Sequence, residues 1–253
     1  MTGCGVLEDH FGDHVATHYD RTHGATFAPD VLGPTVDLLA ELAGDGAALE
    51  FAVGTGRVGL ALAARGVPVT GIELSTAMVA QLQAKDGAAL VDVTIGDMAT
   101  TRVPGTFRLV YLVFNTIGNL ITQAEQVACF ANAAAHLEPG GCFVVEVGVP
   151  RLRHLPPGDD ATVCSHAPGY VGYDRYIDHV AQQAVSHHFS TDGASVREST
   201  TPFRYVWPSE LDLMAALAGM DLYDRWADWG RTPFTGESPS HVSVWRTREP
   251  ERA

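Results

Sequence analysis

The chain reads LEFAVGTGRVGLALAARGVPVTGIELS from residue 49 to residue 75, and this stretch decides the fold. An apolar run that should form a buried strand stops at two closely spaced glycines, Gly54 and Gly56. A helical pattern follows, and a second apolar run then ends at a single acid, Glu73. A strand, a glycine turn, a helix and a second strand in this order predict the first unit of a parallel sheet with helices packed on it.

The alternation of strands and helices continues to residue 150 of the 253-residue chain. Apolar runs predict the strands, and apolar residues spaced three or four apart predict the helices. The expected strands lie at 47–53, 67–72, 91–97, 107–115 and 142–148, and the expected helices lie at 30–43, 57–65, 75–85 and 123–137. The predicted fold class is α/β: a Rossmann-like, mostly parallel sheet with helices on both faces.

The pattern changes in the C-terminal half. Residues 170–206 hold alternating polar and apolar runs with a turn signal at Asp192-Gly193, which predicts an antiparallel β-meander. A helix that begins at Pro208 then returns the chain to the earlier pattern, with strands expected near 221–229 and 241–247. We therefore expect an N-terminal arm and α/β core (1–150), a β-meander cap or insertion (151–206), and a C-terminal helix and strands that complete the core (207–253).

The composition limits the class of partner. The net charge of −14 and the scattered sixteen Lys and Arg residues argue against a nucleic-acid partner. No apolar run reaches the ~18 residues that a membrane span needs, and the N-terminus lacks a basic region followed by an apolar one. The four cysteines and eleven histidines show no metal-ligand spacing, so no metal is expected. These features predict a cytoplasmic protein without a membrane partner.

The ends of the first two strands predict a cofactor site. Glycines at positions 54 and 56 allow unusual backbone angles and the close approach of a ligand to the first amides of a helix. A carboxylate at the end of the second strand, here Glu73, can accept both hydroxyl hydrogens of a ribose. The site therefore suits an adenosine-containing cofactor. The run Gly54-Thr55-Gly56-Arg57-Val58-Gly59 also matches the nicotinamide fingerprint, so the glycines alone leave the cofactor open.

Further motifs narrow the choice of cofactor. Glu50 precedes Gly54 by four residues, GDM follows the third strand at 96–98, LVFNTIGNL ends the fourth at 112–120, and LEPGG leads into the fifth at 137–141. Together these strings resemble the class I S-adenosylmethionine-dependent methyltransferases over residues 45–150. The N-terminal arm and the cap are also similar to small-molecule methyltransferases of actinobacterial type, including sugar N-methyltransferases.

The resemblance implies a role for each motif. Glu73 would hold the ribose hydroxyls, Asp97 would face the adenine amine, and Met98 would lie beside the adenine ring. The end of the fourth strand would lie near the methionine part, and Ala52 stands where the family usually has its first glycine. The implied cofactor residues are Tyr19 (which would close over the cofactor), Glu50, Ala52, Gly54, Thr55, Gly56, Arg57, Glu73, Leu74, Met78, Asp97, Met98, Phe114, Asn115 and Thr116.

The predicted function is methyl transfer from S-adenosylmethionine to an N or O atom of a small-molecule metabolite by in-line displacement, which leaves S-adenosylhomocysteine. Two alternatives stay open from the sequence: a nicotinamide-dependent oxidoreductase, and a non-catalytic protein that binds an adenosyl cofactor. His154 is the first candidate for a general base because it follows the fifth strand, and His179, His187 and His241 come next. The cap is expected to cover the acceptor site and to offer a free strand edge for a homodimer.

Overall fold

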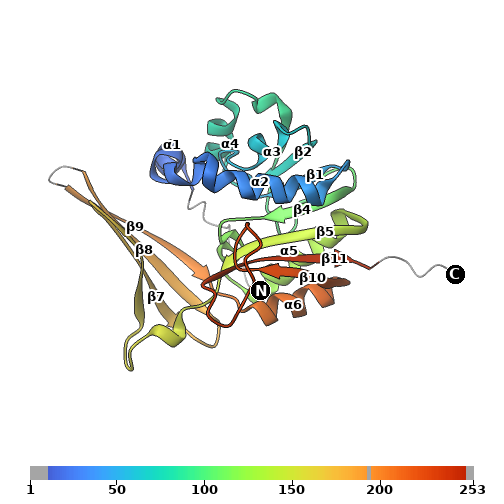
Figure 1. The fold of residues 1–253 in the computed structure, drawn as a ribbon. Helices are drawn as coiled ribbons and strands as arrows, with labels where there is room; N and C mark the ends of the chain where they lie inside the picture. Colours follow the sequence, from blue (N-terminus) through green and yellow to red (C-terminus); the bar gives the residue numbers. More distant parts are fainter. Residues whose placement is uncertain (1–10, 193–194, 249–253) are drawn as a thin grey trace, which may run out of the picture. The chain divides into compact units, whose positions relative to one another are not determined.

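A computed structural model describes residues 11–192 and 195–248 of the chain, coloured in Figure 1. Its strands form two sheets. The seven-stranded sheet has the order β10-β11-β5-β4-β1-β2-β3, and the four-stranded sheet has the order β6-β7-β8-β9. The predicted class, a mostly parallel α/β sheet with a separate antiparallel sheet, is confirmed.

The elements follow the expected alternation. The strands are β1 Ala48–Phe51, β2 Val69–Glu73, β3 Val91–Ile95, β4 Phe107–Leu112, β5 Leu137–Gly148, β6 Ala161–Ala167, β7 Tyr170–Asp178, β8 Gln183–Asp192, β9 Ser195–Arg204, β10 Met220–Trp226 and β11 Ser240–Thr247. The helices are α1 Asp13–Thr22, η1 Gly24–Phe27, α2 Pro29–Ala43, α3 Gly59–Ala63, α4 Thr76–Gln83, η2 Ala88–Leu90, η3 Thr116–Asn119, α5 Gln123–His136, η4 Leu152–His154 and α6 Pro208–Leu217. No helix among these residues is both long enough and apolar enough to cross a lipid bilayer.

The chain divides into two compact units. The first contains the residues up to Tyr111 together with His136–Phe143, and the second contains Leu112–Ala135 and the residues from Val144 onward. In the first unit β1 pairs in parallel with both β2 and β4, and β2 pairs in parallel with β3. Helix α1 lies against α4, where Ala16 packs on Ala77 and Met78 (Figure 1).

The second unit holds the antiparallel structure. β10 pairs with β11, and the buried Trp245 of β11 meets Phe130 of α5 edge to face with ring centroids 5.3 Å apart. The four-stranded sheet is antiparallel throughout and has long, curved strands in Figure 1. At its base Tyr176, Ala184 and Tyr205 form a buried cluster with three half-buried neighbours, Leu152, Leu155 and Phe203.

Three boundaries differ from the sequence prediction. β4 stops at Leu112 instead of residue 115, because Phe114 and Asn115 both take left-handed backbone angles that no strand can continue. β5 begins at Leu137, five residues earlier than expected, so the LEPGG run belongs to the strand. A further strand, β6, precedes the expected meander. The predicted turn at Asp192-Gly193 falls partly outside the described residues, since Gly193 is not among them.

Candidate active site

The loop after β1 has three residues with left-handed backbone angles: Ala52, Gly54 and Gly56, with φ of 53°, 58° and 82°. At Gly56 a larger residue would also not fit, because its Cβ would lie 2.9 Å from Leu60 Cδ1 and from Leu82 Cγ. At Gly54 the nearest atom to such a Cβ would be the Ala52 oxygen at 3.9 Å, so this glycine is required for its angles. Ala52 adopts the same region with a methyl group, which costs roughly 1–2 kcal/mol.

Glu73, at the end of β2, has both carboxylate oxygens fixed by backbone amides. Gly54 N donates to Oε2 at 2.8 Å, and Ser75 N donates to Oε1 at 2.9 Å. Ser75 caps α4, because its Oγ accepts from Met78 N at 3.3 Å. Glu73 is only 6% exposed, and the two amides hold its carboxylate in one orientation.

Asp97 lies at the end of the neighbouring strand β3. Its Oδ1 accepts from Ala99 N at 2.8 Å, and Gly96 N donates to the Glu73 carbonyl oxygen at 2.9 Å. These bonds hold two carboxylates at the carboxyl ends of adjacent parallel strands. Met98 is buried, whereas Leu74 leaves 42% of its surface exposed directly after Glu73.

Glu50 is fully buried inside β1. The Tyr111 hydroxyl donates to its Oε2 at 3.0 Å, and a Cβ on Gly59 would come within 2.6 Å of the same oxygen. Burial raises the pKa of Glu50 to about 8, although the Tyr111 hydrogen bond and the Arg57 charge oppose that rise. The carboxyl group is therefore mostly protonated at neutral pH.

The N-terminal arm is bonded to the glycine loop. Thr55 Oγ1 donates to Asp20 Oδ1 at 2.6 Å, Lys85 Nζ donates to the Thr55 carbonyl at 2.7 Å, and Lys85 pairs with Asp20. Tyr19 precedes Asp20, and burial raises the pKa of its hydroxyl. Asp20 and Lys85 were not predicted from sequence, because each belongs to no motif and they meet only in the fold.

In the second unit, the end of β4 is held by β5. Phe114 and Asn115 have φ of 60° and 62°. Phe114 N donates to Glu146 Oε2 at 2.9 Å, Asn115 N donates to the Glu146 carbonyl at 3.2 Å, and Gly148 N donates to Asn115 Oδ1 at 2.6 Å. Two consecutive left-handed residues that are not glycine are unfavourable by ~1–3 kcal/mol each, so the surrounding bonds must hold them in place. Glu146 was missed by the sequence analysis.

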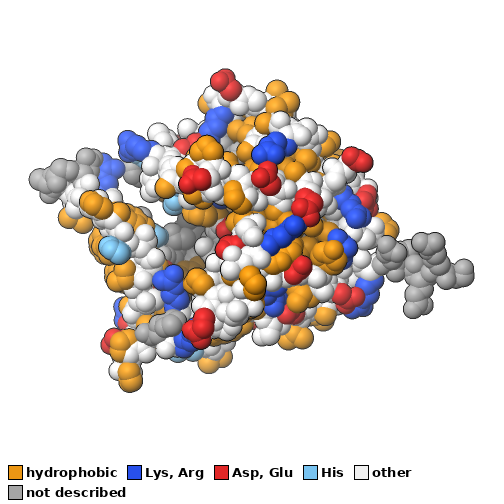
Figure 2. All heavy atoms as spheres, in the orientation of Figure 1, with side chains coloured by type: hydrophobic (Ala, Val, Ile, Leu, Met, Phe, Trp, Pro, Cys, Tyr) orange, Lys and Arg blue, Asp and Glu red, His pale blue; other side chains and the backbone are white. Residues whose placement is uncertain are grey.

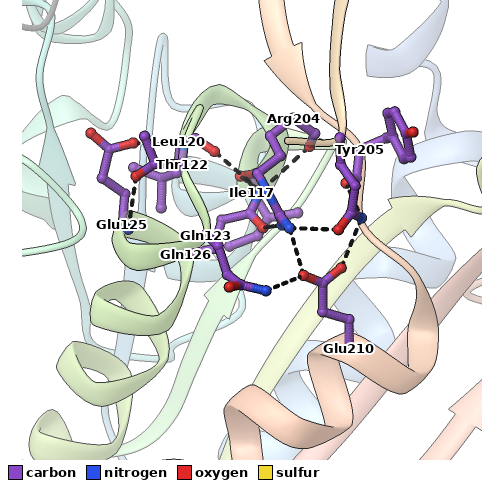
Figure 3. Close-up of polar contacts among 10 residues, drawn as sticks. Ile117, Leu120, Thr122, Gln123, Glu125, Gln126, Arg204, Tyr205 and Glu210 are labelled. Atoms are coloured by element: carbon purple, nitrogen blue, oxygen red, sulfur yellow. Dashed lines mark hydrogen bonds and ion pairs between the residues drawn. The ribbon is translucent and has the colours of Figure 1, made fainter. Parts of the chain in front are cut away.

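A buried polar network fixes the segment that follows (Figure 3). Arg204, at the end of β9, is 2% exposed and donates to Gln126 Oε1, to Gln182 Oε1 at 2.7 Å and to Glu210 Oε1 at 2.6 Å. Gln126 Nε2 in turn donates to the carbonyls of Ile117 and Leu120, both at 3.1 Å. The network therefore joins the four-stranded sheet to η3 and to α5 and α6 (Figure 3).

The predicted site residues fall into both units. The first unit holds Tyr19, Glu50, Ala52, Gly54, Thr55, Gly56, Arg57, Glu73, Leu74, Met78, Asp97 and Met98; the second holds Phe114, Asn115, Thr116 and His154. Met78 is only 2% exposed and packs under α1. Thr116 Oγ1 donates to the Val113 carbonyl at 2.7 Å.

The four histidines considered as general bases differ in their contacts. His154 ends η4, but its side chain lies outside what the structure describes. His179 Nδ1 lies 3.1 Å from the Tyr205 hydroxyl, and His187 Nδ1 lies 3.3 Å from Glu198 Oε1. His241 is buried against Ser243, with Nδ1 2.7 Å from Oγ, and burial lowers its pKa to about 4.

Comparison with known proteins places this geometry in a family. A methyltransferase domain model matches residues 48–141. The structure of the CcbJ methyltransferase from Streptomyces caelestis superimposes with a TM-score of 0.84 at 34% identity, over 94% of this chain and 98% of that one. The cypemycin N-terminal methyltransferase of a Streptomyces species is 27% identical over 206 residues, 78% of this chain and 81% of its own length.

A shorter stretch of the chain matches another protein at higher identity. The dTDP-3-amino-3,4,6-trideoxy-alpha-D-glucopyranose N,N-dimethyltransferase of Streptomyces venezuelae is 40% identical over 78 residues, 30% of this chain and 31% of its own length. The chain belongs to the S-adenosylmethionine-dependent methyltransferases, as the resemblance of its motifs implied. Its cofactor is S-adenosylmethionine, so the nicotinamide alternative is wrong.

Proposed function

We propose that this methyltransferase transfers the methyl group to an amine nitrogen of a small-molecule acceptor. For the binding of the methyl donor, the observation that carries the proposal is the bond from Gly54 N to Glu73 Oε2, which joins the glycine loop to the strand-end acid. Two similar proteins support nitrogen as the acceptor atom, since their names describe N-terminal methylation and N,N-dimethylation. Hydroxyl oxygen is the second candidate.

The described residues fit the cofactor. We propose that the Glu73 carboxylate, which the Gly54 and Ser75 amides hold in one orientation, accepts hydrogen bonds from the two ribose hydroxyls. We propose that Asp97 accepts from the adenine amine and that exposed Leu74 and buried Met98 contact the ring. We propose that Glu50 contacts the methionine end of the cofactor.

Methyl transfer requires little from the protein beyond the positioning of the acceptor against the methyl group. S-adenosylmethionine supplies a methyl group activated by a positively charged sulfur. The bond from carbon to sulfur breaks as the bond from nitrogen to carbon forms, and the electron pair stays with sulfur. The chain's residues hold the acceptor nitrogen in line, which can provide much of the rate. An acceptor that arrives as an ammonium must first lose a proton. His154 as its base stays a prediction.

The charge distribution supports a small-molecule acceptor over a nucleic acid. The chain has a net charge of −14. On the face shown in Figure 2, blue Lys and Arg side chains are interspersed with red Asp and Glu side chains. A polyanion needs a continuous basic stripe to bind.

We also propose that two copies of the chain associate through the four-stranded sheet. Its edge strands β6 and β9 carry exposed valines, Val163 at 56% and Val196 at 67%. Figure 2 shows hydrophobic side chains at the left of the view, where Figure 1 places the four-stranded sheet. Light scattering of the wild type and of Val163→Asp tests this, because a dimer built on this sheet should dissociate in the variant. A wild-type monomer would contradict it.

The proposed reaction is tested in two steps. Calorimetric titration should show binding of S-adenosylhomocysteine and no binding of NAD. The full chain is then incubated with S-adenosylmethionine and a panel of amino sugars, sugar nucleotides bearing an amine, peptides with a free N-terminus and matched alcohols. Mass spectrometry should find a product heavier by one methylene on an amine. Methylation of alcohols alone would contradict the assignment to nitrogen.

A further inference from the structure

The described part of the N-terminal arm, residues 11–22, is fastened at two points to the rest of the first compact unit. The Ser75 hydroxyl donates to the Phe11 carbonyl oxygen at 2.8 Å, and the Thr55 hydroxyl donates to Asp20 Oδ1 at 2.6 Å. Between these two points α1 packs against α4. All of these elements belong to the same unit, so both contacts are internal to it.

Both points belong to the segments that orient the Glu73 carboxylate. The amides of Gly54 and Ser75 hold the two oxygens of this carboxylate. Thr55 directly follows Gly54 and bonds to α1, whereas Ser75 bonds to the chain before α1. The arm is therefore tied to the glycine loop at one end and to the N-cap of α4 at the other.

Lys85, which follows the end of α4, closes a ring of contacts at the glycine loop. Its Nζ donates to the Thr55 carbonyl oxygen at 2.7 Å and pairs with Asp20 Oδ2, while the other Asp20 oxygen accepts from the Thr55 hydroxyl. The same ammonium lies 5.3 Å from the centre of the Phe27 ring, whose face attracts a cation. One positive charge therefore joins the glycine loop, α1 and η1.

These contacts hold Thr55 by its side chain and by its backbone. Thr55 is buried, and its carbonyl oxygen belongs to the peptide that leads into Gly56, where φ is 82°. Only 28% of the Lys85 side chain is exposed, so its hydrogen bonds compete less with water than those of a fully solvated lysine. The ring of contacts therefore restricts the backbone of the glycine loop at the residue between its two glycines.

We propose that Asp20 and Lys85 are positioning residues of the cofactor site, because their ion pair holds the glycine loop in the conformation that binds the adenosyl cofactor. They act through Thr55 and not by contact with the cofactor. When only a fraction of the molecules has the binding conformation, the apparent affinity falls by that fraction. The proposal rests on the cofactor role proposed above for Glu73 and the glycine loop.

Calorimetric titration of the full chain with S-adenosylhomocysteine tests this without any acceptor. Lys85→Met removes the charge and keeps most of the side-chain volume, and Asp20→Ala removes the acceptor of both bonds. Each should raise the Kd about tenfold. The double variant should also show an increase of about tenfold, well short of the roughly hundredfold that two independent losses would give. An unchanged Kd in either single variant, or a hundredfold increase in the double variant, would overturn the proposal.

Variants of Thr55 and a second ion pair separate positioning from a general loss of structure. Thr55→Ser keeps the hydroxyl and should bind within about twofold of the wild type, whereas Thr55→Val keeps the shape alone and should raise the Kd about fivefold. Arg65→Met breaks an ion pair with Asp37 in the same unit, whose side chains are 54% and 61% exposed, and should leave the Kd unchanged. Equal losses in the two Thr55 variants, or a loss in Arg65→Met equal to that in Lys85→Met, would overturn the proposal.

Glu73→Ala, measured in the same titration, separates this proposal from the cofactor site on which it rests. Weaker binding in Glu73→Ala with unchanged binding in Lys85→Met and Asp20→Ala would retain the cofactor site and overturn the positioning role. Unchanged binding in all three variants would overturn both. Weaker binding in all three, with the double variant near tenfold, is the result expected from the contacts at Thr55.

Discussion

Gly54 and Glu73 are nineteen residues apart in the chain, and the amide of the first donates to Oε2 of the second at 2.8 Å. This bond gives Glu73 two structural roles. It closes the glycine loop over the end of β2, and it holds its own carboxylate in one orientation.

Replacing Glu73 tests its proposed role with ribose. Glu73→Ala removes the acceptor of both hydroxyls and leaves the Gly54 and Ser75 amides without it. Hydrogen bonds to a charged acceptor contribute roughly 1.5–3 kcal/mol each, so the Kd for S-adenosylhomocysteine should rise at least about tenfold. Glu138→Ala, which removes an exposed acid paired with Arg108, serves as control in the same calorimetric titration. Unchanged affinity in folded Glu73→Ala would exclude Glu73 from the cofactor site.

Ala52→Gly should stabilise the protein. The left-handed angle at φ of 53° costs an alanine roughly 1–2 kcal/mol, and the extra freedom of glycine in the unfolded chain offsets about half of that gain. The free energy of unfolding in urea should therefore rise by about 0.5–1 kcal/mol. Ala80→Gly, at an exposed position within α4, should lower it by about 1 kcal/mol. Changes of the same sign in both variants would contradict this explanation.

Glu50 should make stability depend on pH. Its pKa is raised from 4.5 to about 8 in the folded protein, so folding favours the protonated form. This contribution is complete below the unfolded pKa and is lost as pH rises toward 8, with a slope of up to about 1.4 kcal/mol per pH unit. Urea unfolding of wild type and Glu50→Gln at several pH values isolates it by difference. Parallel curves for the two proteins would show that Glu50 titrates normally.

The Arg204–Glu210 pair should contribute far more to the free energy of unfolding than an exposed ion pair. Glu210→Gln keeps the shape but removes the charge beside a guanidinium that is almost fully buried, so the free energy of unfolding should fall by about 1–3 kcal/mol. Glu237→Gln breaks the exposed pair with Arg153 and should change it by less than about 1 kcal/mol. Equal losses in the two variants would show that burial of Arg204 adds nothing.

The glycine loop after β1 could be predicted from sequence because its signals are local. Glycines at positions 54 and 56 indicate left-handed backbone angles, and the apolar run places Glu73 at a strand end. The bonds of Glu146 to Phe114 and Asn115, and those of Asp20 to Thr55 and Lys85, could not be predicted in this way. In each case one partner, Glu146 or Asp20, was not predicted as a site residue, and only the folded chain brings it to the motif residues.

The register of the four-stranded sheet could not be predicted for a related reason. Sequence alternation correctly indicated strands, but it does not state which strands pair or in which register. A shift of one residue in β8 would place His187 instead of His188 opposite Gly172. The side chains that each face of the sheet presents therefore depend on register, which the pattern alone leaves open.

The bond from Thr55 to Asp20 has a consequence for the order of events during a catalytic cycle. Because the glycine loop and the arm share this contact, a ligand that stiffens the loop lowers the entropy still to be lost when the arm docks, and a docked arm does the same for the ligand. The two events are thermodynamically linked by equal amounts in both directions. Loss of the Thr55–Asp20 contact should therefore weaken this linkage in both directions.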